Sequence, residues 1–492
     1  MERTIRFEVN KKHDLYAYCN DMCNKVKRMY NVGNYYIRNT ATALTKESEG
    51  KPLTTNEQEV LKNVRDMIDK NNKTSKKSKI VNGKKVKVEK KQLSLPTVEK
   101  KYLNYEQLNA IFSFSNNVDF RSLPIHTAQR ITKVCYQMWK GYFSSLKDFY
   151  KNPSKYKGMP NFPHYKKNDL TTAYFSNISA IIVNDDNGNQ FLQLPSTKYV
   201  YKLGKMNIEK LVKVEIKPFR NVFYILLTVK DDSINVINEE EFKVKNVMAI
   251  DPGVNNFATI TDNLGSHPII IKGGFIKARN QYFNKYKSIE TSNLQQGEDP
   301  NNKHKTSDKL DILSLKRDRF FRDCFFKIAH KICRLALEKD VNLIVIGHNV
   351  RWKNETNHGK ENNQNFVSIP FSQFNHTLMF VGLKYGILVV ENEESYTSKA
   401  SFVDRDIIPT YKKNSNKDYT FSGKRLKRGL YVSKEGIKLN ADVNGSLNIL
   451  RKYCGDESCK DIKDYNKLNS IVTINFKDLY PQHYSKVNQN IA

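Results

Sequence analysis

The order of apolar segments in the second half of the chain limits the folds that it can adopt. Short apolar runs, typical of buried strands, alternate with longer segments whose apolar residues recur at steps of three and four, as in helices. In chain order we expect strands near 247–250, 257–261 and 268–272, a helix at about 308–339, a strand at 342–346, a helix from Pro370 to Gly386, a strand at 387–390 and a last helix around residue 442. This succession predicts an α/β domain.

Two aspartates stand where apolar elements of this domain meet turns. Asp251 ends the first strand and is followed by a Pro-Gly turn, so its side chain is expected to point out of the sheet. Asp442 opens the last helix, where Gly445 and Ser446 leave a small face that can approach the sheet closely. Taken alone, each is better explained as a turn or helix-capping aspartate. The order of elements, however, is that of the ribonuclease H-like fold, in which the first strand, a neighbouring strand end and a late helix bring three carboxylates together.

Three carboxylates suit a phosphodiesterase that uses two metal ions. Two divalent cations about 4 Å apart activate the attacking water and stabilise the leaving oxygen. Mg²⁺ prefers carboxylate oxygens and retained waters to histidine or cysteine. We therefore expect a magnesium-dependent nuclease site, at which Mn²⁺ can substitute, with Asp251 and Asp442 as two of the metal ligands.

The charge of the chain favours a polyanionic partner. Its 492 residues include 82 Lys and Arg against 51 Asp and Glu, a formal net charge of +31 that is spread along most of the length. Nucleic acid relieves self-repulsion of this size. An acidic membrane surface is the competing partner, but the sequence shows no run of about 20 apolar residues and no signal peptide. We expect a cytoplasmic, nucleoid-associated protein of a prokaryote.

The first half of the chain predicts two further regions. Residues 14–150 are mostly helical in pattern, and residues from about 170 to 245 read as a compact, barrel-like β module. The lysine-rich stretch 70–91 interrupts the helices around Asn82-Gly83, and it is expected to form either a short solvated hairpin or a disordered basic loop.

Eight motifs carry a family resemblance over nearly the whole chain. They are SLPIHTAQRITKVCYQMWKGYF, KYKGMPNFPHYKK, MAIDPGVNNFATI, LIVIGHNVRWK, NNQNFVSIPF, EESYTSKASFVDRD, FSGKRLKRGLY and LNADVNGSLNIL. The chain resembles the TnpB proteins of bacterial insertion sequences, which are related to eukaryotic Fanzor and to the small type V CRISPR effector nucleases. The resemblance implies a magnesium-dependent, RNA-guided DNA endonuclease of the RuvC type. Its partners would be a guide RNA and a double-stranded target DNA beside a short adjacent motif, and we expect a monomer.

The resemblance also gives names to the predicted regions. The fold class is α+β and multidomain, with a helical recognition lobe, a β-barrel-like wedge module and a ribonuclease H-like (RuvC) α/β nuclease domain. The expected boundaries are 1–9 for the first wedge strand, 10–165 for the helical lobe, 166–245 for the wedge module, 246–455 for the nuclease domain with a ribbon insertion at 401–438, and 456–492 for a C-terminal tail.

The third carboxylate departs from the family pattern. Most relatives place a glutamate at the end of the strand that here reads LIVIG, so Gly347 occupies the expected position and cannot bind a metal. Some family branches use a relocated glutamate three residues before the Thr-Ser of the TSK motif, which is Glu394 here. We expect Glu394 to be the third ligand, with Glu393 as the alternative, because adjacent residues of an extended segment point to opposite faces. Gly347 would leave room for the longer reach.

The ribbon insertion departs from the family in a second way. Relatives carry two Cys-x-x-Cys pairs there, and the corresponding positions of this chain are Ser401, Asp404, Val432 and Glu435. No structural zinc is expected, because the thiolates of a tetrahedral zinc site are missing. The seven cysteines of the chain, an odd number, also argue against a disulfide framework. We expect packing of Phe402, Phe421, Leu430 and Tyr431 to hold the ribbon instead.

Basic and aromatic residues near these motifs are candidates for nucleic-acid contacts. For the ribbon lysines and arginines, a role in solubility explains the pattern equally well, and a tryptophan near a strand end is as often the edge of a core. The segment ARNQYFNKYK resembles the family's bridging segment along the RNA–DNA duplex. The candidates are Lys424, Arg425, Lys427 and Arg428 in the ribbon, Arg279 and Lys285 in the bridging segment, and Trp352 and Lys353 after the Gly347 strand.

Two other functions compete with a nuclease. A nuclease-dead relative would keep guide and target binding and act as a repressor, and the loss of the usual glutamate at position 347 is the feature that favours it. A generic RNA-binding protein would explain the charge but not the acids. Retention of both aspartates beside a substitute glutamate favours the nuclease.

Overall fold

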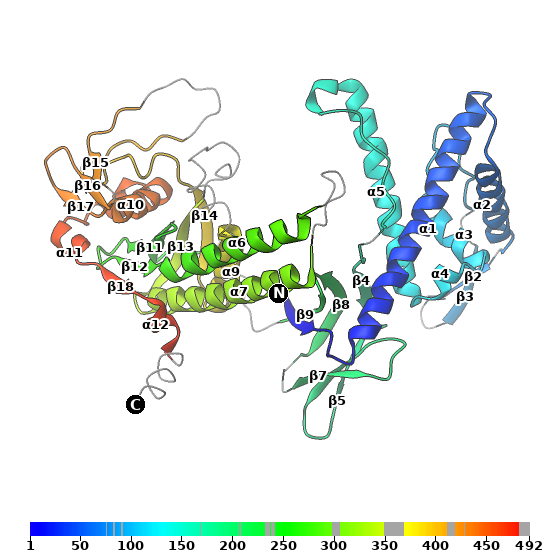
Figure 1. Cartoon of the computed structure of the whole chain (residues 1–492), viewed down its shortest axis with the longest axis horizontal. Helices are drawn as coiled ribbons and strands as arrows, with labels where there is room; N and C mark the ends of the chain where they lie inside the picture. The colour runs from blue at the N-terminus through cyan, green and yellow to red at the C-terminus, as the bar shows by residue number, and fades with distance from the viewer. Residues whose placement is uncertain are drawn as a thin grey trace. The chain divides into compact units, whose positions relative to one another are not determined.

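The structure is a computed structural model, and it describes two compact units, Met1–Asp231 and Asp232–Ala492 (Figure 1). The described residues are all of 1–492 except 75, 82–83, 90–91, 168, 205, 207, 232–236, 238–241, 298–305, 349–368, 411–418, 428 and 482–492, and for 76–81 and 84–89 only the backbone is described. Both units contain helices and sheets, so the chain is a mixed α/β protein of more than one domain. Within the described ranges, no helix is long and apolar enough to cross a bilayer.

The helices of the first unit form its core together with a β-sheet. Buried residues of α1 include Cys19, Met22, Cys23 and Val26, so both cysteines are core residues, as their helical spacing predicts. The lysine-rich stretch forms an antiparallel hairpin, which decides between the two structures expected for it. The elements are α1 (Tyr16–Ser48), α2 (Thr55–Lys73), β2 (Lys76–Val81), β3 (Lys84–Glu89), α3 (Tyr105–Phe114), α4 (Val118–Arg121), α5 (Ile125–Lys151) and the 3-10 helix η1 (Pro153–Lys155).

The other strands of this unit form two separate sheets in the described residues. One sheet has the order β1-β9-β8-β4 and the other β5-β6-β7. A turn in which the N–H groups of Ser179 and Ala180 donate to the carbonyl of Ser176 ends β4 and redirects the chain before β5. The closed, barrel-like module that the sequence suggests is therefore not seen here. The strands are β1 (Glu2–Val9), β4 (Ala173–Ser176), β5 (Ile181–Asn184), β6 (Gln190–Gln193), β7 (Val200–Gly204), β8 (Lys210–Phe219) and β9 (Val222–Lys230).

A six-stranded mixed sheet organises the second unit. Its order is β14-β13-β10-β11-β12-β18. Strand β10 is antiparallel to β11 and parallel to β13, which is parallel to β14. The strands are β10 (Asn246–Pro252), β11 (Asn256–Asp262), β12 (Ile269–Lys272), β13 (Val341–His348), β14 (Leu388–Glu393) and β18 (Val472–Ile474). The five strands predicted along the chain between residues 247 and 390 are all present.

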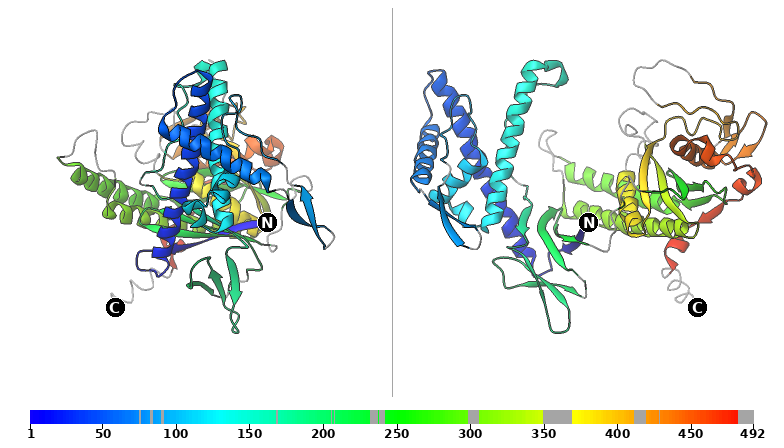
Figure 2. Two further views of the ribbon diagram at one scale, coloured as in Figure 1. Left: turned by 90° about the vertical axis from the view of Figure 1, so that its right-hand side faces the viewer. Right: turned by 180° about the vertical axis from the view of Figure 1, so that it is seen from behind.

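Helices cover both faces of this sheet (Figures 1 and 2). On one face the core joins the sheet to α7 and α9, and on the other it joins the sheet to α10. Because residues of a strand alternate between faces, Val247 and Ala249 of β10 face α10, whereas Met248 and Ile250 face the other helices. The helices are α6 (Gly274–Gln295), α7 (Asp308–Leu337), α9 (Phe371–Lys384) and α10 (Ala441–Cys454).

The segment that follows α10 belongs to the second unit up to residue 481, which corrects the expectation of a separate tail at 456–492. Strand β18 pairs in parallel with β12 and buries Ile474, because its apolar residues complete the edge of the sheet. Between α9 and α10 a small three-stranded sheet forms the ribbon. The remaining elements are β15 (Lys424–Lys427), β16 (Leu430–Val432), β17 (Lys438–Leu439), the 3-10 helix η2 (Asp456–Cys459), α11 (Tyr465–Asn469) and α12 (Phe476–Leu479).

Candidate active site

Asp251 lies near the end of β10, on the face that α10 covers. A β-carbon added to Gly445 of α10 would lie 2.8 Å from Oδ2 of Asp251. The helix can therefore approach this carboxylate only because position 445 has no side chain. The close approach that the small residues beside Asp442 predict is confirmed.

Asp442 lies in the first turn of α10 and is held by neighbours from three elements. The helix starts here because Oδ1 of Asn440 accepts hydrogen bonds from the N–H groups of Asp442, at 2.9 Å, and Val443, at 3.3 Å. Oδ2 of Asp442 accepts a hydrogen bond from Nδ2 of Asn256, at 2.7 Å. Oδ1 of Asp442 lies 3.4 Å from Nη2 of Arg425 on β15. Amide and guanidinium groups thus engage both oxygens.

Asn256 is a site residue that the sequence reasoning missed. Its Oδ1 accepts a hydrogen bond from Nζ of Lys272, at 3.1 Å, so β11 and β12 also contribute to the site. The signal in the sequence was the polar Asn255-Asn256 pair between the Asp-Pro-Gly turn and the apolar strand that resumes at Phe257. Asn256 and Lys272 fix the orientation of the Asp442 carboxylate.

Glu394 comes directly after β14 and reaches toward Gly347 on the neighbouring strand. A β-carbon added to Gly347 would lie 2.6 Å from Oε2 of Glu394 and 2.7 Å from Cδ1 of Ile449 on α10. The carboxylate of Glu394 therefore occupies the space that a side chain at position 347 would enter. The sequence predicted this reach, and the role of Glu394 as a metal ligand remains a prediction.

Glu393 is turned to a different partner. Its Oε2 forms an ion pair with Nζ of Lys452, and its Oε1 accepts a hydrogen bond from the N–H of Ser395, at 2.9 Å. Burial opposes ionisation of Glu393, but the hydrogen bonds from Lys452 and Ser395 outweigh it and lower the pKa of this carboxyl. Of the two adjacent glutamates, Glu394 is the one that lies beside Gly347.

The three acids interact electrostatically. Burial is the largest cause that raises the pKa of Asp251 well above its ordinary value, and repulsion from Glu394 and then from Asp442 adds to it, while Arg425 acts in the opposite direction. Burial, followed by the charge of Glu393, raises the pKa of Glu394 to about 7. Carboxyl groups with raised pKa values in one cluster are typical of functional sites.

The donor set fits a hard divalent cation, although the side chains are not drawn together around one. Within the described residues, no group of three or more His, Cys, Asp or Glu side chains is close enough to hold a metal ion. Ionised carboxylates repel one another, so without a cation they are expected to spread apart. The raised pKa of Asp251 and the guanidinium beside Asp442 both indicate that positive charge would stabilise this cluster.

The candidate nucleic-acid contacts have different surroundings. Lys424, Arg425 and Lys427 are exposed on β15, whose four residues are all exposed. Lys285 of α6 is exposed, whereas the Arg279 guanidinium carbon packs against the rings of Tyr282 and Phe320, at 5.5 and 5.6 Å from their centroids. Arg428, Trp352 and Lys353 lie outside the described residues.

Hydrogen bonds join the two positions of the ribbon at which relatives carry cysteine pairs. The N–H of Asp404 donates to Oγ of Ser401, at 3.2 Å, and Oδ2 of Asp404 accepts from the N–H of Lys434, at 3.0 Å. Lys434 lies between Val432 and Glu435. Of the residues expected to hold the ribbon by packing, Phe402 and Tyr431 are buried. The hydrogen bond from Lys434 to the Asp404 carboxylate connects the two turns.

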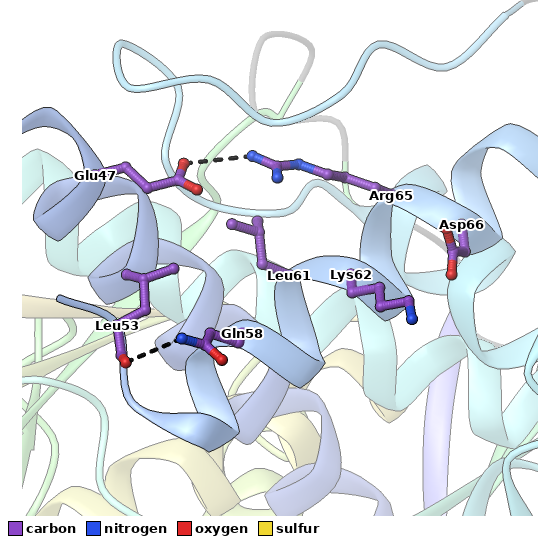
Figure 3. Close-up of a pocket in the computed structure, with 7 residues that line it drawn as sticks. All are labelled: Glu47, Leu53, Gln58, Leu61, Lys62, Arg65 and Asp66. Atoms are coloured by element: carbon purple, nitrogen blue, oxygen red, sulfur yellow. Dashed lines mark hydrogen bonds and ion pairs between the residues drawn. The ribbon is translucent and has the colours of Figure 1, made fainter.

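A hollow lies in the first unit, whereas the three acids belong to the second. It has a volume of about 260 Å³ and is open to solvent (Figure 3). Arg65 pairs with Glu47 at 3.3 Å, and Nε2 of Gln58 donates to the carbonyl of Leu53, also at 3.3 Å. Its lining residues are Glu47, Leu53, Gln58, Leu61, Lys62, Arg65 and Asp66. These groups are largely engaged with one another, so the hollow offers no catalytic arrangement.

Comparisons with known proteins find matches to parts of the sequence. The family model OrfB_IS605, described as a probable transposase, matches residues 224–353. The TnpB-like protein ORF457 of Acidianus two-tailed virus is 27% identical over 218 residues, which are 43% of this chain and 43% of that protein. The match thus spans less than half the length of this relative.

Two solved structures align over most of the chain but with low similarity. One is the cryo-EM structure of the Cas12f1-sgRNA-target DNA complex, with 11% identity and a TM-score of 0.29 over 91% of this chain and 98% of that one. The other is the cryo-EM structure of the CRISPR-Cas12f ternary complex, with 12% identity and a TM-score of 0.28 over the same shares. We draw no conclusion from likenesses of this size.

The segment matched by the family model runs from β9 to the residues after β13. It contains Asp251 and Gly347, whereas Glu394 and Asp442 lie beyond it. The motifs in the sequence, the family model and the viral relative agree, so the resemblance to the TnpB family is confirmed.

Proposed function

We propose that this chain is an RNA-guided DNA endonuclease that hydrolyses phosphodiester bonds in guide-matched DNA next to a short adjacent motif. The observation that carries the proposal is the place of Glu394, whose carboxylate fills the space beside Gly347 where most relatives have a glutamate. The resemblance to the TnpB family and the net charge of +31 support guide RNA and target DNA as partners.

Asp251, Glu394 and Asp442 are the residues that would hold magnesium. Their all-oxygen donor set suits this ion, and Mn²⁺ would be accepted by the same ligands. When bound, the metal would supply a water acidic enough to act as nucleophile and a positive charge that stabilises the leaving oxygen.

The surrounding residues orient the acids and the nucleic acid. Asn256, itself held by Lys272, keeps Oδ2 of Asp442 in a fixed direction. Arg425 lies beside the same carboxylate on an exposed strand, and its planar guanidinium is suited to hold a phosphate of the DNA strand that enters the site. Lys424 and Lys427 would contact neighbouring phosphates.

The remaining regions would bring the substrate to this site. In the proposed mechanism the helices of 10–165 and the strands of 166–245 hold the guide RNA and read the short adjacent motif, while base pairing by the guide reads the rest of the target. Hydrolysis by water needs no covalent protein–DNA intermediate, which separates this function from that of a tyrosine transposase.

Cleavage of a guide-matched plasmid by the copurified protein and RNA tests the proposal. The comparison is between the wild type and the variants Asp251→Ala, Glu394→Ala and Glu393→Ala, with and without Mg²⁺. We expect the first two variants to lose cleavage by roughly 10³-fold or more and to keep target binding. Glu393→Ala is the matched control, and its cleavage should stay within about tenfold of the wild type.

The outcomes separate the proposal from its alternative. If Glu393→Ala lost as much cleavage as Asp251→Ala while Glu394→Ala kept it, Glu393 would be the third acid. Guided binding without cleavage by the wild type would make the protein a nuclease-dead, RNA-guided repressor.

A further inference from the structure

A buried lysine lies next to the turn that carries Glu394. The side chain of Lys452, on α10, is only 8% exposed. Its ammonium forms an ion pair with the carboxylate of Glu393 and donates hydrogen bonds to the carbonyl of Ser395, at 2.9 Å, and to that of Pro409, at 3.0 Å. All three donors of the ammonium are therefore used.

Two of these partners flank Glu394 in the sequence: Glu393 precedes it and Ser395 follows it. The third, Pro409, lies in the ribbon insertion. One helix turn away, Nδ2 of Asn448 donates to the carbonyls of Thr397, at 2.9 Å, and Ala400, at 2.7 Å. Helix α10 thus holds the Glu393 side chain before Glu394 and the backbone after it, through side chains that are themselves buried.

Stability alone does not explain this lysine. Moving an ammonium out of water costs several kcal/mol, and a well-packed apolar residue of similar volume often stabilises a protein as much as a buried ion pair does. A methionine at position 452 would avoid that cost. What the lysine adds is direction, because three hydrogen bonds from one nitrogen fix the Glu393 carboxylate and the backbone at Ser395 and Pro409 relative to α10.

We propose that Lys452 is a positioning residue for Glu394, and that Glu393 is its anchor rather than a metal ligand. This inference rests on the proposed function of the site. Because Asp442 begins α10 and Lys452 lies near its end, the same helix carries one acid directly and sets the position of another. Lys452 thereby replaces the direct support that strand β13 would give to a glutamate at position 347.

Binding of Mn²⁺ to the full-length protein freed of nucleic acid tests the inference. Electron paramagnetic resonance counts the free ion, Asp251→Ala serves as the blank, and cleavage and target binding by the protein–RNA complex are measured in parallel. We expect Lys452→Met to weaken Mn²⁺ binding and to slow cleavage roughly 10- to 100-fold, as is usual when support for a metal ligand is lost, with target binding within about twofold of the wild type.

Lys339→Met is the matched control. Lys339 forms an ion pair of 2.6 Å with Asp262, whose side chain is 2% exposed, at the opposite end of the same sheet. Loss of this pair should lower the melting temperature without changing Mn²⁺ binding. An equal weakening of Mn²⁺ binding in both variants, or none in Lys452→Met, would overturn the inference.

A second variant keeps the inference testable if Lys452→Met does not fold. Glu393→Gln keeps the shape of the anchor and removes its charge, and it should weaken Mn²⁺ binding by several-fold, up to about tenfold. Unchanged binding would overturn the inference. A wild type that neither binds Mn²⁺ better than Asp251→Ala nor cleaves DNA would instead refute the proposed function itself.

Discussion

The two faces of the six-stranded sheet differ in what their cores contain. On the face toward α7 and α9, aromatic rings fill the core: Phe257 lies 4.8 Å from Phe374 and 5.7 Å from Phe325, measured between ring centroids. On the face toward α10, three polar residues of the helix, Asn444, Ser446 and Asn448, are fully buried. Both faces of the sheet thus have an apolar core, and the face toward α10 adds a buried hydrogen-bond network.

The difference shows that the two kinds of packing contribute different properties: apolar burial contributes stability, and buried hydrogen bonds fix the positions of the backbone. Burial of apolar rings is strongly stabilising but has little directional preference. Buried polar groups contribute less net stability, yet each must meet its partner, so they fix backbone positions. Asn444, for example, accepts a hydrogen bond from the N–H of Phe402, at 2.9 Å, and donates to the carbonyl of Ala400, at 2.8 Å. The candidate site lies on the side where geometry is fixed.

Replacement of an acid should have the largest effect on function and little on folding. We expect Asp251→Asn to reduce cleavage by at least about 10³-fold, because the three-acid cluster would lose a charge that no neighbour can supply. Without metal the variant should melt at a higher temperature than the wild type, since burial and repulsion from Glu394 and Asp442 no longer oppose an ionised group. Plasmid cleavage and thermal unfolding in EDTA check both effects, with the exposed Asp340→Asn as control. Retained cleavage by Asp251→Asn would mean that the active site does not lie on the face toward α10.

The aromatic face should respond in the reverse way. Phe325→Ala removes a fully buried ring that stacks with Phe257, so we expect a loss of about 3–5 kcal/mol in the free energy of unfolding. Cleavage per folded molecule should stay within a few-fold of the wild type. Urea unfolding and active-site titration measure the two quantities. If folded Phe325→Ala lost as much cleavage as Asp251→Asn, the apolar face would contribute to catalysis and not only to stability.

The raised pKa of Glu394 predicts a pH-dependent difference in stability. The pKa is about 7 in the folded chain and 4.5 for an ordinary glutamate, so the folded state holds this proton more tightly. The stability that accompanies the protonated group is present below pH 4.5 and is lost as the pH rises through 7. In EDTA, Glu394→Gln should match the wild type near pH 5 and exceed its stability near pH 8 by up to about 3 kcal/mol. A difference in stability between Glu394→Gln and the wild type that stays constant from pH 5 to pH 8 would contradict the raised pKa of Glu394.

A pair of glycine substitutions compares the two faces at the smallest scale. At Gly382, facing β14 from α9, a β-carbon would lie 2.9 Å from the backbone oxygen of Ile387, which cannot easily move. At Gly347 it would meet the ends of the flexible side chains of Glu394 and Ile449. We expect Gly382→Ala to cost about 1–3 kcal/mol with normal cleavage, and Gly347→Ala to cost about 1 kcal/mol or less.

Cleavage should be affected more by Gly347→Ala than by Gly382→Ala, the reverse of the order expected for stability. Because Gly347→Ala displaces the Glu394 carboxylate, we expect a reduction of roughly tenfold. Chemical unfolding and plasmid cleavage of both variants provide the comparison. Normal cleavage by Gly347→Ala would mean that Glu394 does not depend on the space beside this strand.

Most elements could be read from the sequence because their apolar periodicity is strong. The strands at 247–250 and 342–346 and the helix at about 308–339 appear as β10, β13 and α7, with boundaries shifted by at most two residues. The C-terminal segment was misassigned because β18 has only three residues, and its pairing with β12 joins residues about 200 positions apart. No local pattern predicts such a partner.

The candidate site divides in the same way. The sequence by itself determined the positions of Asp251 and Asp442, because a turn and a helix start are local events that nearby residues specify. Only the tertiary structure decided which of Glu393 and Glu394 lies beside Gly347, since adjacent carboxylates carry the same local signal. Lys452 takes one and the space beside Gly347 receives the other. Both of those partners lie on other elements, and only packing of α10 and β13 against the end of β14 brings them into reach.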